Sequence, residues 1–205
     1  MPNTKESDPA KKGRPRSAEV EKAILKAAAT LLAERGFKAF TIEEVALRAK
    51  VGKPSIYRRW QSKGTLALDA FLTQYVPLLP PINTRSLTGD LQAALTAWIQ
   101  AVDGTTMGRS LVGLIAEAQS DPDLAIAWHE RFISTARGQH RLMIERAIER
   151  EEIPRDSDVD VLMDMLYGPA YHRLLNGHLP FNERSVQEVV EVIVAGAKSR
   201  SAAPS

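Results

Sequence analysis

The sequence contains no cysteine among its 205 residues, and only 6% of them are aromatic. The absence of thiols excludes disulfides, thiolate zinc sites, iron–sulfur clusters and a cysteine nucleophile. No run of residues approaches the roughly 18 apolar residues that a membrane span requires. The polar N-terminus is not followed by the apolar segment of a secretory signal. We therefore expect a cytoplasmic protein with no membrane partner.

Signals for β-strands are also scarce, because the β-branched residues recur at helical spacings and no Asn-Gly or Asp-Gly turn separates alternating runs. The pattern predicts an all-α fold. Glycine, proline and capping residues divide the chain into segments with amphipathic periodicity. We expect helices at about residues 17–35, 42–49, 53–60, 63–75, 88–102, 105–119, 122–151, 157–176 and 183–198.

The charge of the chain is divided unevenly. Residues 1–65 contain 15 Lys and Arg against 7 Asp and Glu, whereas the remainder contains 12 against 18, so the net charges are +8 and −6. A basic segment of this kind is typical of a polyanion-binding module joined to another domain, although a solvated surface is the alternative. We expect a basic disordered arm, a DNA-binding domain, a second helical domain and a disordered tail, at residues 1–16, 17–65, 66–198 and 199–205.

Two short helices, at residues 42–49 and 53–60, enclose a three-residue turn, which is the arrangement of a helix-turn-helix. Thr41 precedes the first helix and Glu44 follows three residues later, which is a capping-box pattern. The second helix is rich in hydrogen-bond donors and has no carboxylate, as a helix that enters the DNA major groove requires. An ordinary helical hairpin explains this composition poorly. The donors belong to Lys53, Ser55, Tyr57, Arg58 and Arg59.

A set of residues at fixed spacings extends through this region: Thr41, Val45, Ala46, Ala49, Val51, Ile56, Tyr57, Ser62 and Lys63. In this pattern the chain resembles the tetracycline-repressor (TetR) family of bacterial transcriptional regulators over roughly residues 21–71. The resemblance implies that Thr41 and Lys63 bind phosphates. It further implies that the residues in or beside the major groove are Lys53, Pro54, Ser55, Tyr57 and Arg59. The chain departs from the usual pattern at Lys50, Gly52 and Trp60, which leaves the operator sequence open.

The basic arm at residues 11–16, with the sequence KKGRPR, is similar to the Gly-Arg-Pro core of AT-hook segments. Arg14 and Arg16 would then enter a narrow A·T-rich minor groove. The alternative is a nonspecific contact with phosphates, and both alternatives steepen the salt dependence of DNA binding.

The resemblance also implies that the C-terminal domain binds a small-molecule effector and dimerises. The last two helices are strongly amphipathic, so they either fill their own core or pack with a second copy as a four-helix bundle. We favour a homodimer through these helices because a palindromic double-stranded operator requires two recognition helices about 34–36 Å apart. The candidate pocket residues, for each of which core packing is the alternative, are Trp98, Met107, Trp128, Phe132, Met163, Tyr167, Tyr171 and His172.

We find no sequence motif of a hydrolase, a nucleotide-binding site or a zinc protease. Asp156, Asp158 and Asp160 begin like a calcium loop, but Val161 occupies the glycine position, so these aspartates are better explained as charge at a helix N-terminus. We expect no catalytic residue, no metal site and no cofactor. The sequence favours a ligand-responsive repressor, with an activator or ligand-independent regulator, or less readily a helical enzyme or carrier, as alternatives.

Overall fold

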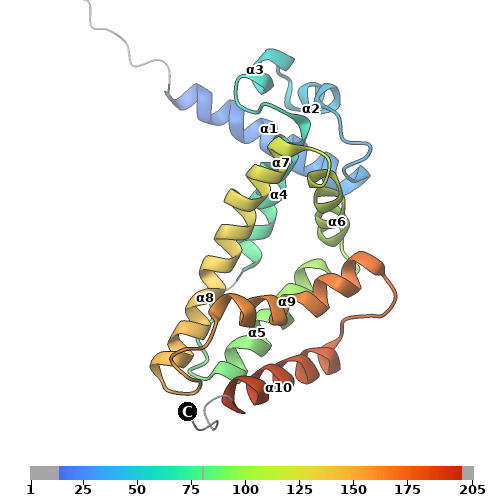
Figure 1. Cartoon of the computed structure of the whole chain (residues 1–205). Coiled ribbons are helices and arrows are strands. Elements are labelled where there is room, and N and C mark those ends of the chain that lie inside the picture. The colour runs from blue at the N-terminus through green and yellow to red at the C-terminus, as the bar shows by residue number, and fades with distance from the viewer. Residues whose placement is uncertain (1–13, 80, 200–205) are drawn as a thin grey trace, which may run out of the picture.

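The computed structural model describes residues 14–79 and 81–199, and these residues confirm the all-α prediction (Figure 1). Within these ranges there is no β-strand, and no helix combines the length and apolar character needed to cross a bilayer. The helical elements are α1 (Arg14–Arg35), α2 (Ile42–Ala49), α3 (Lys53–Tyr57), α4 (Lys63–Tyr75), the 3₁₀ turn η1 (Val76–Leu78), α5 (Leu87–Val102), α6 (Thr106–Ala118), α7 (Pro122–Ala127), the π-helical η2 (Trp128–Ile133), α8 (Ser134–Glu149), α9 (Val159–Asn176) and α10 (Glu183–Ser199).

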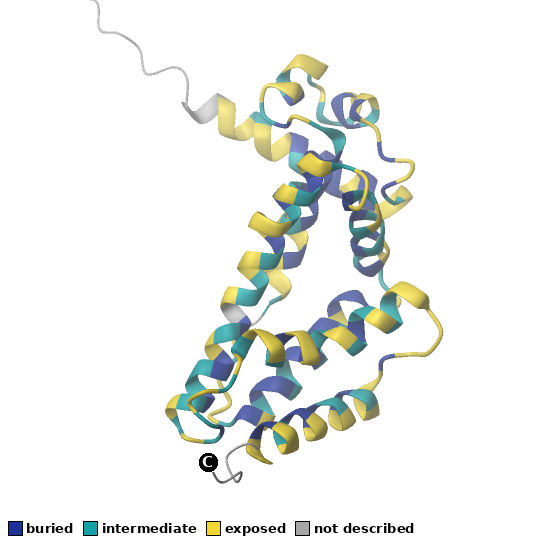
Figure 2. Ribbon diagram, viewed as in Figure 1, coloured by how far each residue is buried: buried dark blue, intermediate teal, exposed yellow. Residues whose placement is uncertain are grey.

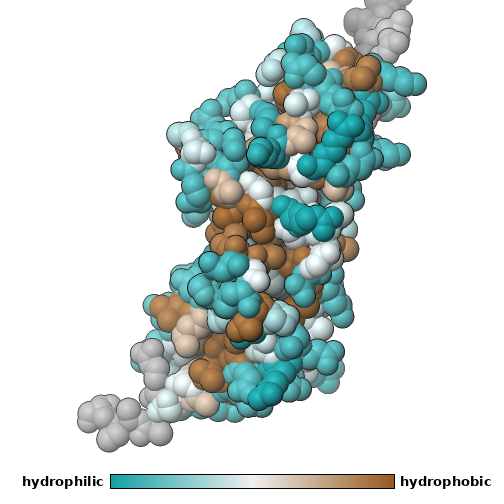
Figure 3. Space-filling model, turned by 90° about the vertical axis from the view of Figure 1, so that its right-hand side faces the viewer, coloured by the Kyte–Doolittle hydropathy of each residue, from teal (hydrophilic) through white to brown (hydrophobic). Residues whose placement is uncertain are grey.

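The molecule is elongated, with two ends joined by long helices. Helices α1, α2 and α3 form the upper end in Figure 1, and α5, α9 and α10 form the lower end. Helix α4 leads down from the upper end, and α8 runs beside it towards the lower end. Figure 3 shows a largely hydrophilic upper end and apolar surface gathered at the waist and on the lower part.

Buried apolar side chains explain why the upper helices pack as they do. Ile24 and Leu31 of α1 are fully buried, and their spacing of seven residues places both on one face of the helix. Ile56 and Trp60, which the sequence predicts to face inward together, are 0% and 5% exposed. The same core continues down α4 and into the lower helices, so one set of buried residues connects both ends (Figure 2).

The ends of the two short helices differ slightly from the prediction. The Thr41 hydroxyl accepts a hydrogen bond from the Glu44 N–H at 3.3 Å, but the Glu44 carboxylate pairs with Arg48, so only half of the capping box forms. Helix α3 ends at Tyr57 instead of residue 60. The chain then turns tightly, and the backbone N–H of Trp60 donates a hydrogen bond to the Ile56 carbonyl at 3.0 Å.

Helix α1 begins at Arg14, three residues before the predicted start at residue 17, so Arg14 to Arg16 of the predicted arm are helical. Pro15 is compatible with a first helical turn, because a proline there removes an N–H that has no partner within the helix. The remainder of the arm, residues 1–13, lies outside the described residues, as does the tail from residue 200, and Ser199 belongs to α10.

The helix predicted over residues 122–151 is not uniform. It is divided into α7, the wider π-helical turn η2 and α8. Both the N–H and the hydroxyl of Ser134 bond to the His129 carbonyl five residues earlier, and Trp128 stacks on Phe132 at 4.3 Å between ring centroids. The hydrogen bond of a π-helical turn spans one residue more than that of an α-helical turn, and periodicity in the sequence does not reveal this extra residue. Turns of this kind occur frequently at functional sites.

Lys50 ends α2 with a left-handed backbone, at φ 55° and ψ 44°. A side chain is unfavourable in this conformation, whereas glycine adopts it freely. We therefore expect Lys50→Gly to raise the midpoint of thermal unfolding by about 1–4 °C. Lys50→Ala removes the same charge but keeps the side-chain carbon, and an equal gain in this control would attribute the effect to charge.

Candidate DNA-binding surface and internal pocket

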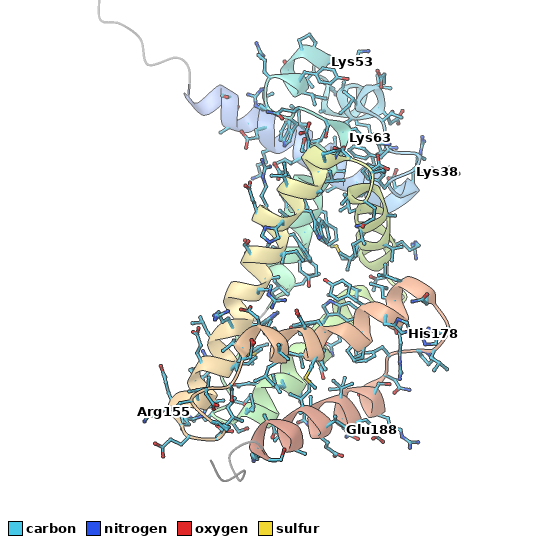
Figure 4. All side chains as sticks on the ribbon, viewed as in Figure 1. Lys38, Lys53, Lys63, Arg155, His178 and Glu188 are labelled. Carbon is cyan, nitrogen blue, oxygen red and sulfur yellow. The ribbon has the colours of Figure 1, made fainter. Side chains whose placement is uncertain are left out.

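Helix α3 lies at the extreme upper end of the molecule, where its outer surface is accessible. Figure 4 shows Lys53 at this end and Lys63 below it, at the start of α4. Tyr57 is 54% exposed although it is aromatic, and Lys53, Pro54 and Arg58 are also exposed. An exposed helix end rich in donors is the geometry needed to contact base edges.

Lys53 is held by a neighbouring carboxylate on α2. Its Nζ lies 2.9 Å from Oε1 of Glu43, and this ion pair raises the pKa of Lys53 and lowers the pKa of Glu43. Lys53 therefore stays charged, and a DNA acceptor would compete with Glu43 for it.

Arg59 lies closer to the protein than the sequence suggests. Its guanidinium donates to the Ser17 hydroxyl at 2.8 Å and to the Ser55 carbonyl at 2.9 Å. The side chain is only 20% exposed and lies 3.9 Å from Glu21. Arg59 thus joins the end of α3 to α1, a contact across 42 residues that no local pattern indicates.

The remaining predicted DNA contacts lie around α3. The Thr41 hydroxyl caps α2, and the Ser55 hydroxyl accepts from Arg58 at 3.2 Å. Lys63 Nζ lies 4.4 Å from the centroid of the Phe37 ring, which orients this lysine at the N-terminus of α4. The structure gives the backbone of Arg14 and Arg16 in the first turn of α1, and their side chains lie outside the described part of the chain.

A cavity of about 310 Å³, open to solvent beside Asp164 and Gly168, lies among α4, α5, α8, α9 and η2. Five of the eight predicted pocket residues line it: Trp98, Phe132, Met163, Tyr167 and Tyr171. No sequence pattern indicated the other lining residues, namely Tyr75, Ile133, Ala136, Arg137, His140, Asp164 and Gly168. Tyr75 is buried on α4, and no local signal in the sequence links it to a pocket.

The other three predicted residues lie elsewhere. Met107 borders a groove between α1, α4 and α6, Trp128 packs behind the cavity wall against Phe132, and His172 is exposed beside His178. Large side chains in the middle of a helix face in several directions. Their position along the helix therefore did not distinguish Met107, Trp128 and His172 from the residues that line the cavity.

The polar groups deep in the cavity are uncharged. The Tyr167 hydroxyl lies 2.8 Å from Nδ1 of His140, and burial lowers the pKa of His140 to about 4. Burial also raises the pKa of Tyr171 to about 12. At neutral pH the cavity therefore offers neutral imidazole and phenol groups for hydrogen bonding.

Charged groups lie at the edge of the cavity. Arg137 of α8 reaches Asp164 of α9 at 2.6 Å and Asp160 at 3.0 Å. Arg141 also pairs with Asp160, at 3.1 Å. These hydrogen bonds raise the pKa of both arginines and lower the pKa of Asp160.

Asp69 of α4 joins the upper end of the molecule to the cavity wall. Its carboxylate accepts a hydrogen bond from the Trp60 indole at 2.9 Å and is contacted by Arg131 of η2 at 2.8 and 3.0 Å. Phe132 and Ile133, the next residues of η2, line the cavity. Asp69 therefore contacts both Trp60, which follows α3, and Arg131, which directly precedes the residues of η2 that line the cavity.

Figure 2 shows exposed residues along α9 and α10, and several of them are apolar residues that the described chain leaves uncovered. Val161, Met165 and Leu175 on α9 are 50%, 44% and 46% exposed, and Val192 on α10 is 63% exposed. Gly168 and Gly196 are exposed on the same faces and have open space around them. An apolar stripe of this kind is typical of a surface that packs against another helix pair.

The acidic residues before α9 behave as a helix cap. Asp158 accepts hydrogen bonds from the N–H groups of Asp160 and Val161 at 3.0 and 3.1 Å, as the N-terminal charge pattern predicted. In the part of the chain that the structure describes, no three histidine or carboxylate side chains are grouped so as to hold a metal ion.

Comparisons with known proteins agree with this arrangement. The sequence model described as bacterial regulatory proteins, tetR family, matches residues 24–70, and the model described as tetracyclin repressor-like, C-terminal domain, matches residues 81–193. The chain is 34% identical to YdeS of Bacillus subtilis, an uncharacterised helix-turn-helix transcriptional regulator, over 95% of this chain and 98% of that protein. It is 26% identical to the regulator AqdR of Rhodococcus erythropolis over 75% and 73% of the two chains.

A similar structure has also been solved. The crystal structure of the TetR family transcription regulator SCO0332 superimposes with a TM-score of 0.77 at 35% identity, covering 87% of this chain and 98% of that one. The similarity therefore extends over both the helix-turn-helix and the C-terminal helical domain.

Proposed function

This chain belongs to the TetR family of bacterial helix-turn-helix transcriptional regulators, and from that premise we propose that it is a homodimeric repressor that a small molecule releases from a palindromic operator. Regulation of transcription through DNA binding is the function of the family to which the chain belongs. The single observation that carries the finer proposal is the common contact of Asp69 with Trp60 and Arg131, which connects a DNA-binding end to a cavity wall.

The DNA contacts that we propose follow from exposure and chemistry. Lys53 and Tyr57 reach base edges in the major groove, with Pro54, Ser55 and Arg58 beside them. Thr41 and Lys63 bind phosphates, and Arg14 and Arg16 extend the contact along the duplex. Arg59 contributes chiefly by fixing α3 on α1, because Ser17 and Ser55 already occupy its guanidinium.

Two copies associate, in this proposal, through the outer faces of α9 and α10. The exposed apolar residues Val161, Met165 and Val192 support this assignment, since a two-fold axis along such a stripe buries it on both copies at once. The assembled dimer presents two α3 helices to two half-sites.

The cavity, in turn, holds the effector. A ligand that favours one conformation of the cavity wall shifts the populations of the two forms, and typical coupling between such sites is about 1–3 kcal/mol. An aliphatic and aromatic lining with a few polar groups supports this assignment.

A side chain that fills the cavity should imitate the effector. Ala136 lines the cavity on α8, and its neighbour Thr135 is exposed. We expect Ala136→Trp to weaken binding to a duplex selected from a random pool by about 5- to 150-fold, with the dimer intact, as measured by fluorescence anisotropy and sedimentation. Thr135→Trp should bind like the wild type, and unchanged binding by a folded Ala136→Trp protein would count against effector release.

The contacts of Asp69 should carry this effect to the DNA-binding end. In Asp69→Asn the charge that holds Arg131 is removed, while an oxygen remains for the Trp60 indole. We expect Ala136→Trp to lose most of its effect on DNA affinity in the Asp69→Asn background, which a double-mutant cycle measures directly. Asp123→Asn on α7 is the matched control, and an equal cavity effect in all three backgrounds would exclude this route.

A further inference from the structure

Among the residues that the structure describes, the cavity has no unpaired charge to offer a ligand. Among the described residues that line it, Arg137 and Asp164 are the charged ones, and they bond to each other at 2.6 Å. The second nitrogen of the Arg137 guanidinium donates to Asp160, both to its carboxylate at 3.0 Å and to its carbonyl at 3.1 Å.

These contacts matter most for an anionic ligand. Such a ligand would need Arg137 as its counter-charge, and it would have to displace Asp164 and then lie near Asp160, which repels it. A cationic ligand would have to take Asp164 from Arg137 and leave that arginine without its shortest ion pair. The side chains of Asp160 and Asp164 are 62% and 70% exposed, so a displaced aspartate would stay hydrated. The cost falls on the ligand, because its charge would leave water for a largely apolar lining in which Arg137 is already paired.

The interior of the cavity is suited to rings. Phe132 packs against Tyr75 at 5.4 Å between ring centroids, and Trp98 packs against Tyr171 at the same separation. The pair formed by Tyr167 and His140 supplies a hydrogen-bonding group that is neutral in either tautomer of the histidine. A flat molecule with one carbonyl or hydroxyl group meets both requirements.

We propose that this cavity takes an uncharged, ring-bearing ligand with a single polar group, and that Asp160 and Asp164 determine specificity by occupying Arg137 and so excluding anions. The proposal rests on the proposed function, because it names the chemical class of the effector. In this proposal Asp160 and Asp164 determine which ligand charge is accepted. Tyr167 and His140 bind the polar group of the ligand.

Three naphthalene probes of one shape test the charge selectivity: 2-acetylnaphthalene is neutral, 2-naphthoate is an anion and 2-naphthylmethylammonium is a cation. Isothermal titration of the full chain should give the neutral probe an affinity at least about tenfold higher than that of either ion. Preferential binding of the anion or the cation would overturn the proposal, and so would the failure of all three probes to bind.

The double variant Asp160→Asn/Asp164→Asn tests whether these two carboxylates cause the selectivity against anions, because it keeps the size of both side chains and frees Arg137. Binding of 2-naphthoate should strengthen at least about tenfold, and binding of 2-acetylnaphthalene should change by less than about threefold. Adding Arg137→Leu should abolish the gain for the anion. The control Asp123→Asn/Asp156→Asn makes the same change in net charge at exposed sites. A gain in this control equal to that of the first variant, or no gain in either, would contradict the proposal.

The DNA readout separates this inference from the proposed function. If 2-acetylnaphthalene binds with the expected selectivity but neither it nor Ala136→Trp alters DNA affinity, the ligand class is supported and the effector role fails. If Ala136→Trp releases DNA but 2-naphthoate binds best, the effector role is supported and the ligand class is overturned.

Discussion

Val192→Glu is expected to convert the protein to a monomer at micromolar concentration and to weaken operator binding by on the order of 100-fold or more. Val192 is the most exposed large apolar residue in the described part of α10, and its glutamate would meet apolar surface or a second glutamate across the two-fold axis. Because a monomer contacts a single half-site, loss of the dimer removes the benefit of binding both half-sites together. Analytical ultracentrifugation and anisotropy with a selected duplex measure the two effects.

Gln187→Glu is the matched control for this result. Gln187 lies on the same helix and is also exposed, but five residues along a helix rotate it by about 140° from Val192. It should remain dimeric and bind DNA normally. A dimeric Val192→Glu protein would show that the copies associate through another surface.

Lys53→Ala and Lys63→Ala are expected to weaken DNA binding in different ways. Lys53 lies on the recognition helix, so its loss should reduce the discrimination between bases at its position by roughly 5- to 150-fold in each half-site. Lys63 lies at the start of α4 near the Phe37 ring, so its loss should weaken all sequences nearly equally and lower the salt slope by about 1 per subunit. Because a homodimer contains two copies of each lysine, the loss of base discrimination and the loss of salt dependence each occur in both half-sites.

These two variants are compared by titrating selected and scrambled duplexes at several salt concentrations. Lys198→Ala, at the opposite end of the molecule on α10, controls for the loss of one positive charge. Equal changes in base discrimination for Lys53→Ala and Lys63→Ala would refute the division of roles between base and phosphate contacts.

Local patterns were sufficient to predict most of the fold. The stripes of Ile24 and Leu31, the inward pair Ile56 and Trp60, and the capping residues before α2 and α9 all depend on residues within one or two turns of each other. The π-helical turn at Trp128 was not predicted, because it depends on the packing of Phe132 among aromatic rings from α4.

The cavity was only partly predictable for the same reason. Tyr167 and Phe132 were selected for their size and position, but the pairing of His140 with Tyr167 spans 27 residues. The ion pair between Arg137 and Asp164 also joins two helices, and each residue alone resembles ordinary surface charge. The contacts of Asp69 with Trp60 and Arg131 required the three-dimensional arrangement of three elements.

Selection of bound sequences from a random duplex pool, carried out with purified wild-type protein at two salt concentrations, tests the central claim most directly. A homodimeric regulator with the recognition helix described above should enrich a two-fold palindrome whose half-sites are centred about one helical turn, or a multiple of it, apart. Enrichment should persist at the higher salt concentration, where nonspecific phosphate binding declines. Failure to enrich any sequence, or enrichment of a single half-site without symmetry, would contradict dimeric, sequence-specific recognition.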